Sequence, residues 1–517
     1  MSPISRGTEI SHRTISVGTL MESSGVTFGT SGARGLAVAM TDEVCYAYTL
    51  AFLHYLESNN EITPGMDIAV GGDLRSSTDR ILAAVCKAIS DSGYNIHYSG
   101  KLPSPAVALF GFINKIPSVM VTGSHIPDDR NGIKYNRPTG EIMKDDESGI
   151  KSQHIEIPQK LFSKHGMFTA DFPLTSASSE ATALYVKRYT DFFPKECLRG
   201  KKIGLYEHSS VGRDVLYDIM TKLGADVTRL GFSETFIPVD TEAIRMEDVN
   251  LAKQWANEYY FDSIISADGD CDRPLISDEK GTWLRGDVAG ILCASYLEAD
   301  AVVTPVSSNT AVEKCNRFEK VIRTRIGSPF VIAGMNQAAA NGAVRTIGYE
   351  ANGGFLINAP ITINDKTLQE LPTRDAVIVL ISILLLSMRN GKTISQLKAD
   401  LPQRFTASNR LKEFPTEKSQ KIIAQLNSGN FAKDKDAIET VFSVVSGEVA
   451  ALDTTDGLRI TFDNKEVIHL RPSGNAPEFR CYTEADSEAR SVEMNSACIT
   501  IMKNWQNAAE SLYPMHT

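Results

Sequence analysis

The sequence predicts an α/β protein in which three similar α/β domains with mixed sheets are followed by a C-terminal α+β domain. Two observations lead to this prediction: a strand–loop–helix–strand order recurs three times, and the C-terminal part of the chain follows a different pattern. Units of the first kind form parallel or mixed sheets that are covered by helices. With 517 residues, 42% of them hydrophobic, the chain can bury several cores.

Each of the three copies begins with a short β-branched strand and passes through a polar or glycine-rich loop into an amphipathic helix. The predicted strand pairs are 67–70 and 94–98, 202–206 and 226–230, and 301–304 and 320–323. Beyond Pro402, segments such as 458–462 and 467–470 alternate in polarity around a turn at Asp463–Asn464, and a long helix is predicted from Ala485. Alternating strands of this kind are typical of an antiparallel sheet.

Composition excludes several classes of partner. The net charge of −10, from 63 acidic and 53 basic residues without a basic run, disfavours nucleic acid and membrane surfaces. The eight cysteines form no CxxC pair, which is typical of reduced cytosolic thiols. The N-terminus contains no apolar signal segment, and the most apolar run, 376–388, is too short to cross a bilayer and predicts a buried helix. We therefore expect a soluble cytoplasmic protein, monomeric or homodimeric.

One short motif presents a serine in a tight turn. In 121–127, Gly123 and Pro127 favour a rigid turn that offers the hydroxyl of Ser124 to a cleft. Lys134 follows closely and can neutralise a phosphate or move a proton. A Ser/Thr-rich surface turn is the alternative interpretation of this stretch.

A second motif gathers carboxylates. Asp268, Asp270 and Asp272 alternate with small residues directly after the apolar run 263–267, so all three side chains can face one point. Their mutual repulsion predicts a divalent cation such as Mg²⁺, and the preceding strand places them at the carboxyl edge of a sheet, where ligands bind. Arg273 can hold a phosphate beside the metal. The alternative is an exposed acidic loop.

A serine hydroxyl beside hard oxygen ligands is what phosphoryl transfer on a divalent cation needs. Three carboxylates and a phosphoserine carry about −5, of which one Mg²⁺ leaves about −3. The cations expected to offset this charge are Arg34, Lys134 and Arg273. Arg34 lies in the glycine-rich stretch 28–35, which suits a loop that approaches a ligand closely.

Two further loops carry groups that can bind a sugar phosphate. The stretch 471–480 combines arginines with a Ser-Gly-Asn turn that can bind an anion, through Arg471, Ser473, Gly474, Asn475 and Arg480. The stretch 349–355 offers Glu350 and Asn352 on a glycine-flanked loop that can form hydrogen bonds with sugar hydroxyls. A hairpin turn with solvated arginines is the alternative for the first loop.

Taken together, five stretches resemble the signature loops of the α-D-phosphohexomutases, the phosphomannomutase/phosphoglucomutase superfamily: TFGTSGARG, TGSHIPDDRNGIK, DGDCDRP, YEANGG and RPSGNAPEFR. The resemblance spans Phe28 to Arg480. It implies four domains around a central cleft, namely 1–183 with the phosphoserine loop, 184–284 with the metal loop, 285–402 with the sugar loop and 403–517 with the phosphate loop.

The resemblance also implies an activity. It is that of an isomerase that interconverts a hexose 6-phosphate and its 1-phosphate, with mannose expected, through phospho-Ser124 and a hexose 1,6-bisphosphate. Mg²⁺ would be held by the Ser124 oxygen and by Asp268, Asp270 and Asp272. Glucose or an amino sugar is the nearest alternative. A haloacid-dehalogenase-type enzyme with Asp268 as nucleophile and a non-catalytic sugar-phosphate sensor are alternatives of other classes.

The sequence departs from the family pattern at several positions. Ile126 stands where the serine loop usually has Asn, and Tyr349, Asn352 and Gly354 differ from the commonest sugar loops. Gly354 and Ser328 stand where many or some members carry histidines that transfer protons. That role therefore cannot be carried over to this chain, and Lys134 is the expected acid/base.

Overall fold

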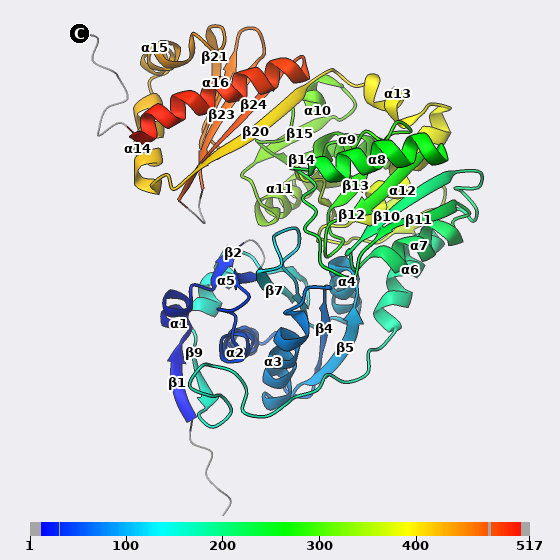
Figure 1. The fold of residues 1–517 in the computed structure, drawn as a ribbon, viewed down its shortest axis with the longest axis vertical. Helices are drawn as coiled ribbons and strands as arrows, with labels where there is room; N and C mark the ends of the chain where they lie inside the picture. Colours follow the sequence, from blue (N-terminus) through cyan, green and yellow to red (C-terminus); the bar gives the residue numbers. More distant parts are fainter. Residues whose placement is uncertain (1–11, 30–31, 474–476, 508–517) are drawn as a thin grey trace, which may run out of the picture. The chain divides into compact units, whose positions relative to one another are not determined.

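The computed structural model describes residues 12–29, 32–473 and 477–507. The chain divides into two compact units. Figure 1 labels their helices and strands. The first contains the chain up to Glu298 together with Arg345–Ile347 and Asn352–Ser395, and the second contains Ala299–Val344, Gly348–Ala351 and the chain from Gln396. The boundaries predicted for four domains remain predictions.

The N-terminal sheet of the first unit is mixed. Its order is β2-β3-β7-β6-β4-β5, and β8 pairs with β7. Strands β4, β5 and β6 are parallel, whereas β7 runs back against β6. The bounds are β2 Thr27–Gly29, β3 Gly32–Leu36, β4 Asp67–Gly72, β5 Asn95–Lys101, β6 Ser118–Val121, β7 Arg130–Arg137 and β8 Gly140–Glu141.

Five helices and a two-stranded ribbon accompany this sheet. They are α1 Val17–Ser24, α2 Asp42–Ser58, α3 Thr78–Asp91, α4 Ser104–Asn114 and α5 Lys144–Lys151, with β1 His12–Ser16 antiparallel to β9 His154–Pro158. Helix α2 begins where the Thr41 side chain accepts a hydrogen bond from the amide of Val44, and Asp42 and Glu43 favour the positive end of its dipole.

The second sheet follows the order β11-β10-β12-β13. Strand β10 is parallel to both β11 and β12, and β13 is antiparallel to β12. All five residues of β12 are buried, so the segment after it leaves the interior of the sheet at its carboxyl edge. The bounds are β10 Lys202–His208, β11 Asp226–Phe232, β12 Ser263–Ala267, β13 Pro274–Ile276, α6 Glu180–Phe192, α7 Arg213–Lys222, α8 Met246–Tyr259 and α9 Gly286–Tyr296.

The third sheet has the order β15-β14-β16-β17, and β14 is parallel to β15. Its elements are β14 Ala301–Pro305, α10 Ala311–Lys314, β15 Lys320–Thr324, α11 Ser328–Ala340, β16 Thr346–Tyr349 and β17 Phe355–Ile357. The hairpin β18 Ile361–Ile363 and β19 Lys366–Leu368 precedes α12 Ala376–Asn390, the apolar helix, which is buried over most of its length. Within the described residues, we find no helix with the length and hydrophobicity that a membrane span requires.

The C-terminal sheet is antiparallel throughout, in the order β20-β24-β23-β22-β21. Its elements are α13 Ile394–Ala399, β20 Phe405–Lys412, α14 Thr416–Leu426, α15 Phe431–Phe442, β21 Val449–Asp453, β22 Leu458–Phe462, β23 Val467–Pro472, β24 Glu478–Ala485 and α16 Glu488–Asn507. The predicted hairpin is present. The helix predicted from Ala485 begins instead at Glu488, because Ala485 pairs with Phe405 across the sheet.

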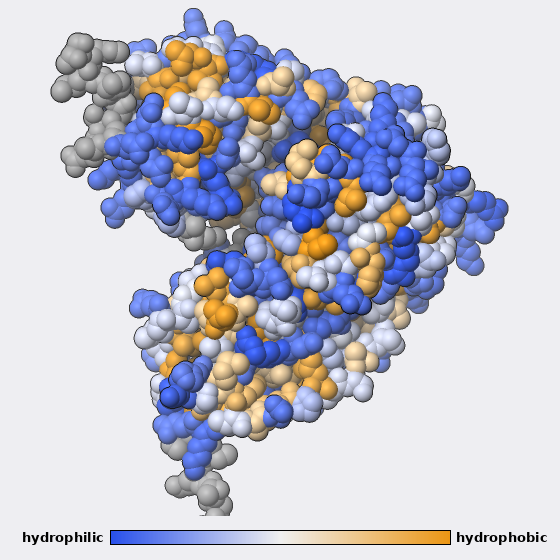
Figure 2. Space-filling model, in the orientation of Figure 1, coloured by the Kyte–Doolittle hydropathy of each residue, from blue (hydrophilic) through white to orange (hydrophobic). Residues whose placement is uncertain are grey.

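Three sheets that contain parallel strand pairs and alternate with helices, together with one antiparallel sheet, confirm the predicted fold class. Separate hydrophobic clusters underlie the first, second and C-terminal sheets. The face drawn in Figure 2 is mainly hydrophilic, with small scattered apolar groups, as expected when the large apolar side chains lie in such cores.

Candidate functional site

Ser124 lies in the turn between β6 and β7 and is fully buried. Its backbone has φ 55°, a left-handed conformation that is uncommon for a residue other than glycine. The hydroxyl of Ser124 donates a hydrogen bond to Oδ2 of Asp268 over 2.5 Å. This hydrogen bond joins the serine loop, residues 121–127, to residues 268–273, here called the acidic loop. The two bonded residues are 144 positions apart in the chain.

The acidic loop follows β12 and folds back on itself. The amides of Asp272 and Arg273 donate to Oδ1 of Asp268, and Cys271 has φ 59°. Asp268, Asp270 and Asp272 are buried, and each offers a carboxylate oxygen within 4.8 Å of the others. The alternation in the sequence therefore produces the expected convergence, whereas the role of these groups as metal ligands remains a prediction.

Lys134 reaches this cluster from β7. Its Nζ lies 2.6 Å from Oδ2 of Asp270 and 2.6 Å from Oδ2 of Asp272. Gly32 on β3 pairs with Lys134, and a Cβ on Gly32 would lie 2.0 Å from the carbonyl oxygen of Ile133. The glycine-rich N-terminal stretch is thus needed for the close approach of the two strands at Lys134.

Arg34 and Arg273 lie in the same cluster. Arg34 pairs with Gly132 of β7, and a Cβ on Gly132 would lie 3.0 Å from Cγ of Arg34. Burial, together with the charges of Arg273 and Arg374, lowers the pKa of Arg34 to about 10. Nε of Arg273 lies 3.7 Å from Oδ1 of Asp272.

Two residues of the cluster were not predicted from the sequence. Arg374, directly before the capping residue of α12, forms an ion pair of 3.1 Å with Oδ2 of Asp272. Nη1 of Arg273 lies 2.8 Å from Nδ1 of His125, and since a guanidinium can only donate, the histidine nitrogen accepts. Burial and the charges of Arg273 and Arg34 lower the pKa of His125, which favours the neutral ring.

The carboxylates differ in their electrostatic environment. Burial, reinforced by the charges of Asp270 and Asp272, raises the pKa of Asp268 well above its usual range. Burial alone would also raise the pKa of Asp270, but the ammonium of Lys134 outweighs it and lowers the pKa. For Asp272, the positive charges led by Arg374 likewise outweigh burial and lower the pKa.

The formal charges of the cluster favour an anionic ligand. If all three carboxylates are ionised they give −3, and the four cations Lys134, Arg34, Arg273 and Arg374 give +4, so the protein groups sum to +1. Arg374 thus supplies one positive charge more than the sequence predicts. A phosphate group can be bound here in spite of the negative charge of the whole chain.

The acidic cluster also fits a divalent cation that prefers oxygen ligands. The Oδ1 atoms of Asp270 and Asp272 are buried and lack a hydrogen-bond partner among the residues that the structure describes. Buried carboxylate oxygens of this kind are costly unless a cation or a donor satisfies them. Carboxylates and a hydroxyl oxygen are ligands that Mg²⁺ accepts readily.

Part of the predicted sugar loop packs beside this cluster. The Asn352 side chain accepts a hydrogen bond from the amide of Gly354, and the Asn352 carbonyl accepts one from the Thr241 hydroxyl. A Cβ on Gly354 would lie 2.5 Å from Cδ of Arg374. Arg374 therefore leaves little room for a side chain at position 354. Glu350 is buried and belongs to the second unit.

The predicted phosphate loop also belongs to the second unit. Nε of Arg471 lies 2.8 Å from Oδ2 of Asp456, and Nη2 of Arg480 lies 3.2 Å from Oε2 of Glu478. The amide of Ser473 donates to the carbonyl of Glu478. Gly474 and Asn475 lie outside the described residues.

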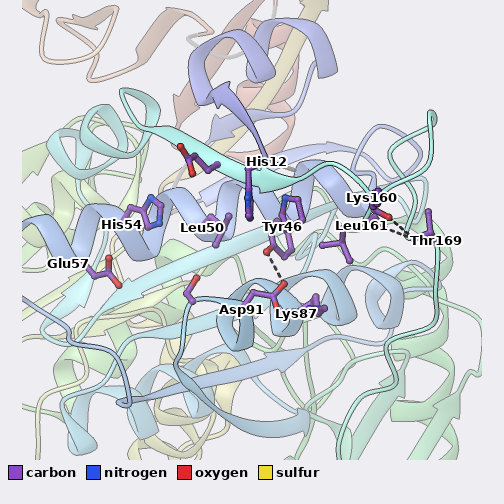
Figure 3. A pocket seen from close by; sticks show the side chains of 13 residues that line it. His12, Tyr46, Leu50, His54, Glu57, Lys87, Asp91, Lys160, Leu161 and Thr169 are labelled. Carbon is purple, nitrogen blue, oxygen red and sulfur yellow. Dashed lines mark hydrogen bonds and ion pairs between the residues drawn. The ribbon is translucent and has the colours of Figure 1, made fainter. Parts of the chain in front are cut away.

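A separate cavity of about 790 Å³ lies between α2, α3 and the β1–β9 ribbon (Figure 3). His12, Tyr46 and His54 line it, and the Tyr46 hydroxyl donates to Asp91 over 2.9 Å. Of the motif residues that the structure describes, none contributes to this cavity. The convergence of charged groups around Ser124, rather than cavity volume, therefore identifies the candidate site.

Comparison with known proteins agrees with this geometry. Residues 25–160 match α/β/α domain I of phosphoglucomutase/phosphomannomutase, residues 285–405 match its α/β/α domain III, and residues 414–496 match its C-terminal domain. The phosphomannomutase of Salmonella muenchen is 44% identical over 91% of this chain and 94% of the relative, and that of Sinorhizobium fredii is 42% identical over 89% and 95%.

The fold is shared with a solved structure, that of a putative phosphomannomutase from Thermus thermophilus. Its TM-score is 0.70 at 17% identity, over 92% of this chain and 99% of the other. The family domains, the two relatives and the five loops agree along nearly the whole chain. The chain belongs to the phosphoglucomutase/phosphomannomutase family, the α-D-phosphohexomutases.

Proposed function

We propose that this protein is a Mg²⁺-dependent phosphomannomutase that interconverts mannose 6-phosphate and mannose 1-phosphate through a phosphoserine enzyme. The observation that supports this most directly is the Ser124 hydroxyl, 2.5 Å from Asp268 in a buried acidic cluster. The phosphomannomutases that are 44% and 42% identical to this chain support mannose as the sugar.

The residues of the chain have distinct roles in this proposal. Ser124 carries the phosphoryl group, and Arg34, Arg273 and Arg374 offset its charge. Asp268, Asp270, Asp272 and the Ser124 oxygen would hold Mg²⁺, which acts as a Lewis acid and reduces the negative charge on the transferring group. Arg471, Ser473, Gly474, Asn475 and Arg480 are proposed to bind the phosphate that does not react, and Glu350 and Asn352 the sugar hydroxyls.

In the proposed reaction, each phosphoryl transfer between Ser124 and the sugar is accompanied by a proton transfer in the opposite direction. The bond between phosphorus and the Ser124 oxygen breaks, and a bond from phosphorus to the free sugar hydroxyl forms, which gives the 1,6-bisphosphate. The sugar hydroxyl loses a proton and the serine oxygen gains one, and Lys134 is the proposed carrier. The bisphosphate then returns its other phosphoryl group to Ser124, so added bisphosphate acts as an activator.

The contacts of Asp268 bear on the alternative chemistry of a haloacid-dehalogenase-type enzyme, in which this carboxylate would be the nucleophile. Oδ1 of Asp268 accepts two backbone amides and Oδ2 accepts the Ser124 hydroxyl. These contacts favour a carboxylate that supports the serine over one that attacks phosphorus. A non-catalytic sensor would have no need for a serine so placed.

A comparison of three substrates tests the proposed function. We expect turnover of mannose 1-phosphate, with hexose 1,6-bisphosphate and Mg²⁺ present, at a higher kcat/KM than glucose 1-phosphate or glucosamine 1-phosphate. A higher value for either of the other sugars would retain the mutase and replace mannose as the substrate. The absence of turnover with all three would contradict the proposal.

Asn352 is predicted to influence which sugar is accepted. Its side chain shapes the loop through the amide of Gly354 and lies beside Arg374 at the acidic cluster. We expect Asn352→Ser to change the ratio of kcat/KM for mannose and glucose 1-phosphates more than it lowers their sum. Equal losses on both sugars would indicate uniform binding or a structural role.

Arg471 is predicted to bind the phosphate remote from the reaction. Loss of a charge-assisted hydrogen bond costs roughly 1.5–3 kcal/mol. We therefore expect Arg471→Ala to lower kcat/KM by about 10- to 100-fold, mainly through KM, while excess bisphosphate still phosphorylates Ser124. Arg410→Ala is the control, because Arg410 is half exposed in the same sheet. An unchanged kcat/KM in Arg471→Ala would remove this loop from the site.

A further inference from the structure

Arg75, in the segment between β4 and α3, forms hydrogen bonds with the backbone of the serine loop. Its side chain is 0% exposed. Nη2 donates to the carbonyls of Ser124 over 2.8 Å and Ile126 over 2.5 Å, and Nη1 donates to those of Pro127 over 2.6 Å and Arg130 over 3.1 Å. Four hydrogen bonds from one guanidinium therefore fix the backbone that carries the serine.

Asp73 completes this arrangement. Its Oδ2 accepts Nε of Arg75 over 3.1 Å, so all five guanidinium N–H groups have an acceptor. The same oxygen accepts the Thr122 hydroxyl over 2.8 Å, and the Thr122 oxygen in turn accepts the amide of Ser124 over 2.8 Å. The amide and the carbonyl of Ser124 are thus both held, the first through Asp73 and the second by Arg75.

Sheet topology brings these groups together. Gly72, the last residue of β4, pairs in parallel with Val121, the last residue of β6, so Asp73 and Thr122 leave the sheet side by side. A Cβ on Gly123 would lie 2.5 Å from Cζ of Arg75, so only glycine leaves room for the guanidinium there. The ring of Phe236 lies 4.0 Å from Cζ of Arg75.

Phe236 also supports the acidic loop. A Cβ on Gly269 would lie 2.6 Å from the carbonyl oxygen of Ser124 and 2.9 Å from Cζ of Phe236. The serine loop, the guanidinium and the acidic loop therefore pack closely against one another at Gly123 and Gly269. The uncommon φ of Ser124 persists because its surroundings determine it.

We propose that Asp73 and Arg75 are positioning residues for phosphoryl transfer: they hold the backbone of Ser124 so that its hydroxyl meets the acidic cluster. This inference rests on the proposed function, because it concerns the serine that carries the phosphoryl group. Neither residue touches the reacting atoms. Misplacement of a nucleophile by about 1 Å can lower a rate about 100-fold, so the effect of losing the pair falls on kcat.

Arg75→Lys tests the proposal. Lysine keeps the charge but has three donors instead of five and cannot span four carbonyls. We expect kcat and the rate of Ser124 labelling by ³²P-labelled hexose bisphosphate to fall about 100-fold, while KM changes less than about threefold. Labelling of the wild-type protein is measured first, because its absence would contradict the proposed function itself.

Arg80→Lys is the matched control. Arg80 lies in helix α3, which directly follows the segment of Arg75. It also donates to backbone carbonyls, those of Met40 and Ala37, and pairs with Asp42. We expect this variant to lose stability and to keep the wild-type kcat. Wild-type labelling and kcat in Arg75→Lys, or an equal fall of kcat in both variants, would overturn the proposal and leave the proposed function intact.

A second variant avoids dependence on the folding of Arg75→Lys. Gly123 has no positive φ, so alanine is compatible with its backbone, and the three atoms nearest to the added Cβ all belong to the guanidinium of Arg75. We expect Gly123→Ala to lower kcat and the labelling rate in parallel, with KM and the Mg²⁺ concentration for half-maximal activity changed by less than about threefold. A wild-type kcat in this variant would overturn the proposal.

Discussion

Replacement of Ser124 by alanine is expected to abolish both phosphorylation of the enzyme and nearly all turnover. Serine is a poor nucleophile unless its surroundings stabilise the charge that develops on its oxygen. Here the hydroxyl meets a buried carboxylate, with cations of the same cluster nearby. No other hydroxyl is expected to take over this position, because the loop around Ser124 is closely packed.

Incubation with ³²P-labelled hexose bisphosphate is the direct measurement. The wild-type protein should carry label on one serine, recovered in the peptide that contains 122–127, and Ser124→Ala should carry none. Ser118→Ala is the matched control: Ser118 is also buried, on the strand that leads to the turn, and accepts a hydrogen bond from Asn136. Acid- and base-labile label on Asp268 would contradict the phosphoserine mechanism in favour of an acyl phosphate.

Residues that are close in the sequence were the easiest to predict. The three aspartates of the acidic loop converge because a short turn follows a buried strand, and this pattern is visible in the sequence itself. The apolar helix predicted over 376–388 is found as Ala376–Asn390, because a continuous apolar run is likewise visible in the sequence. The predicted start of the last helix was wrong. Pairing with Phe405 keeps Ala485 in a strand, and that partner is distant in the sequence.

Contacts between distant segments were predicted only in part. The resemblance to a family placed Ser124 beside the acidic loop, and the structure shows the hydrogen bond to Asp268. Arg374 was not predicted as a site residue. Its neighbours in the sequence indicate the start of a helix and do not indicate an ion pair with Asp272. The donors of Arg75 likewise reach carbonyl groups, and a backbone carbonyl has no signature in a sequence.

Replacement of Lys134 by methionine is expected to lower kcat by about 100- to 10,000-fold, the range typical of a general acid or base. Methionine fills much of the volume of the lysine stem but neither holds nor moves a proton. The ammonium lies 2.6 Å from two buried carboxylates, so its removal also leaves negative charge unpaired. Loss of one partner from a buried ion pair destabilises a protein by roughly 3–5 kcal/mol.

These two consequences can be measured separately. Without Mg²⁺, the Tm of Lys134→Met should lie well below that of the wild-type protein, because the carboxylates have lost a counter-ion. Added Mg²⁺ should raise the Tm of the variant more than that of the wild type, because the cation binds the folded state and replaces the lost charge. Lys87→Met is the control, since the ion pair of Lys87 with Asp91 is partly exposed and such pairs contribute about 1 kcal/mol or less.

The restored stability is what makes the kinetic result decisive. If kcat of Lys134→Met stays low at Mg²⁺ concentrations that bring its Tm back towards the wild type, the missing function is proton transfer and not the charge balance of the cluster. If kcat returns together with Tm, Lys134 is a counter-ion of Asp270 and Asp272, and the acid/base role does not belong to it. His125 is then a poor candidate for that role, because its Nδ1 already accepts a hydrogen bond from Arg273, and burial with the neighbouring arginines lowers its pKa and so disfavours the imidazolium.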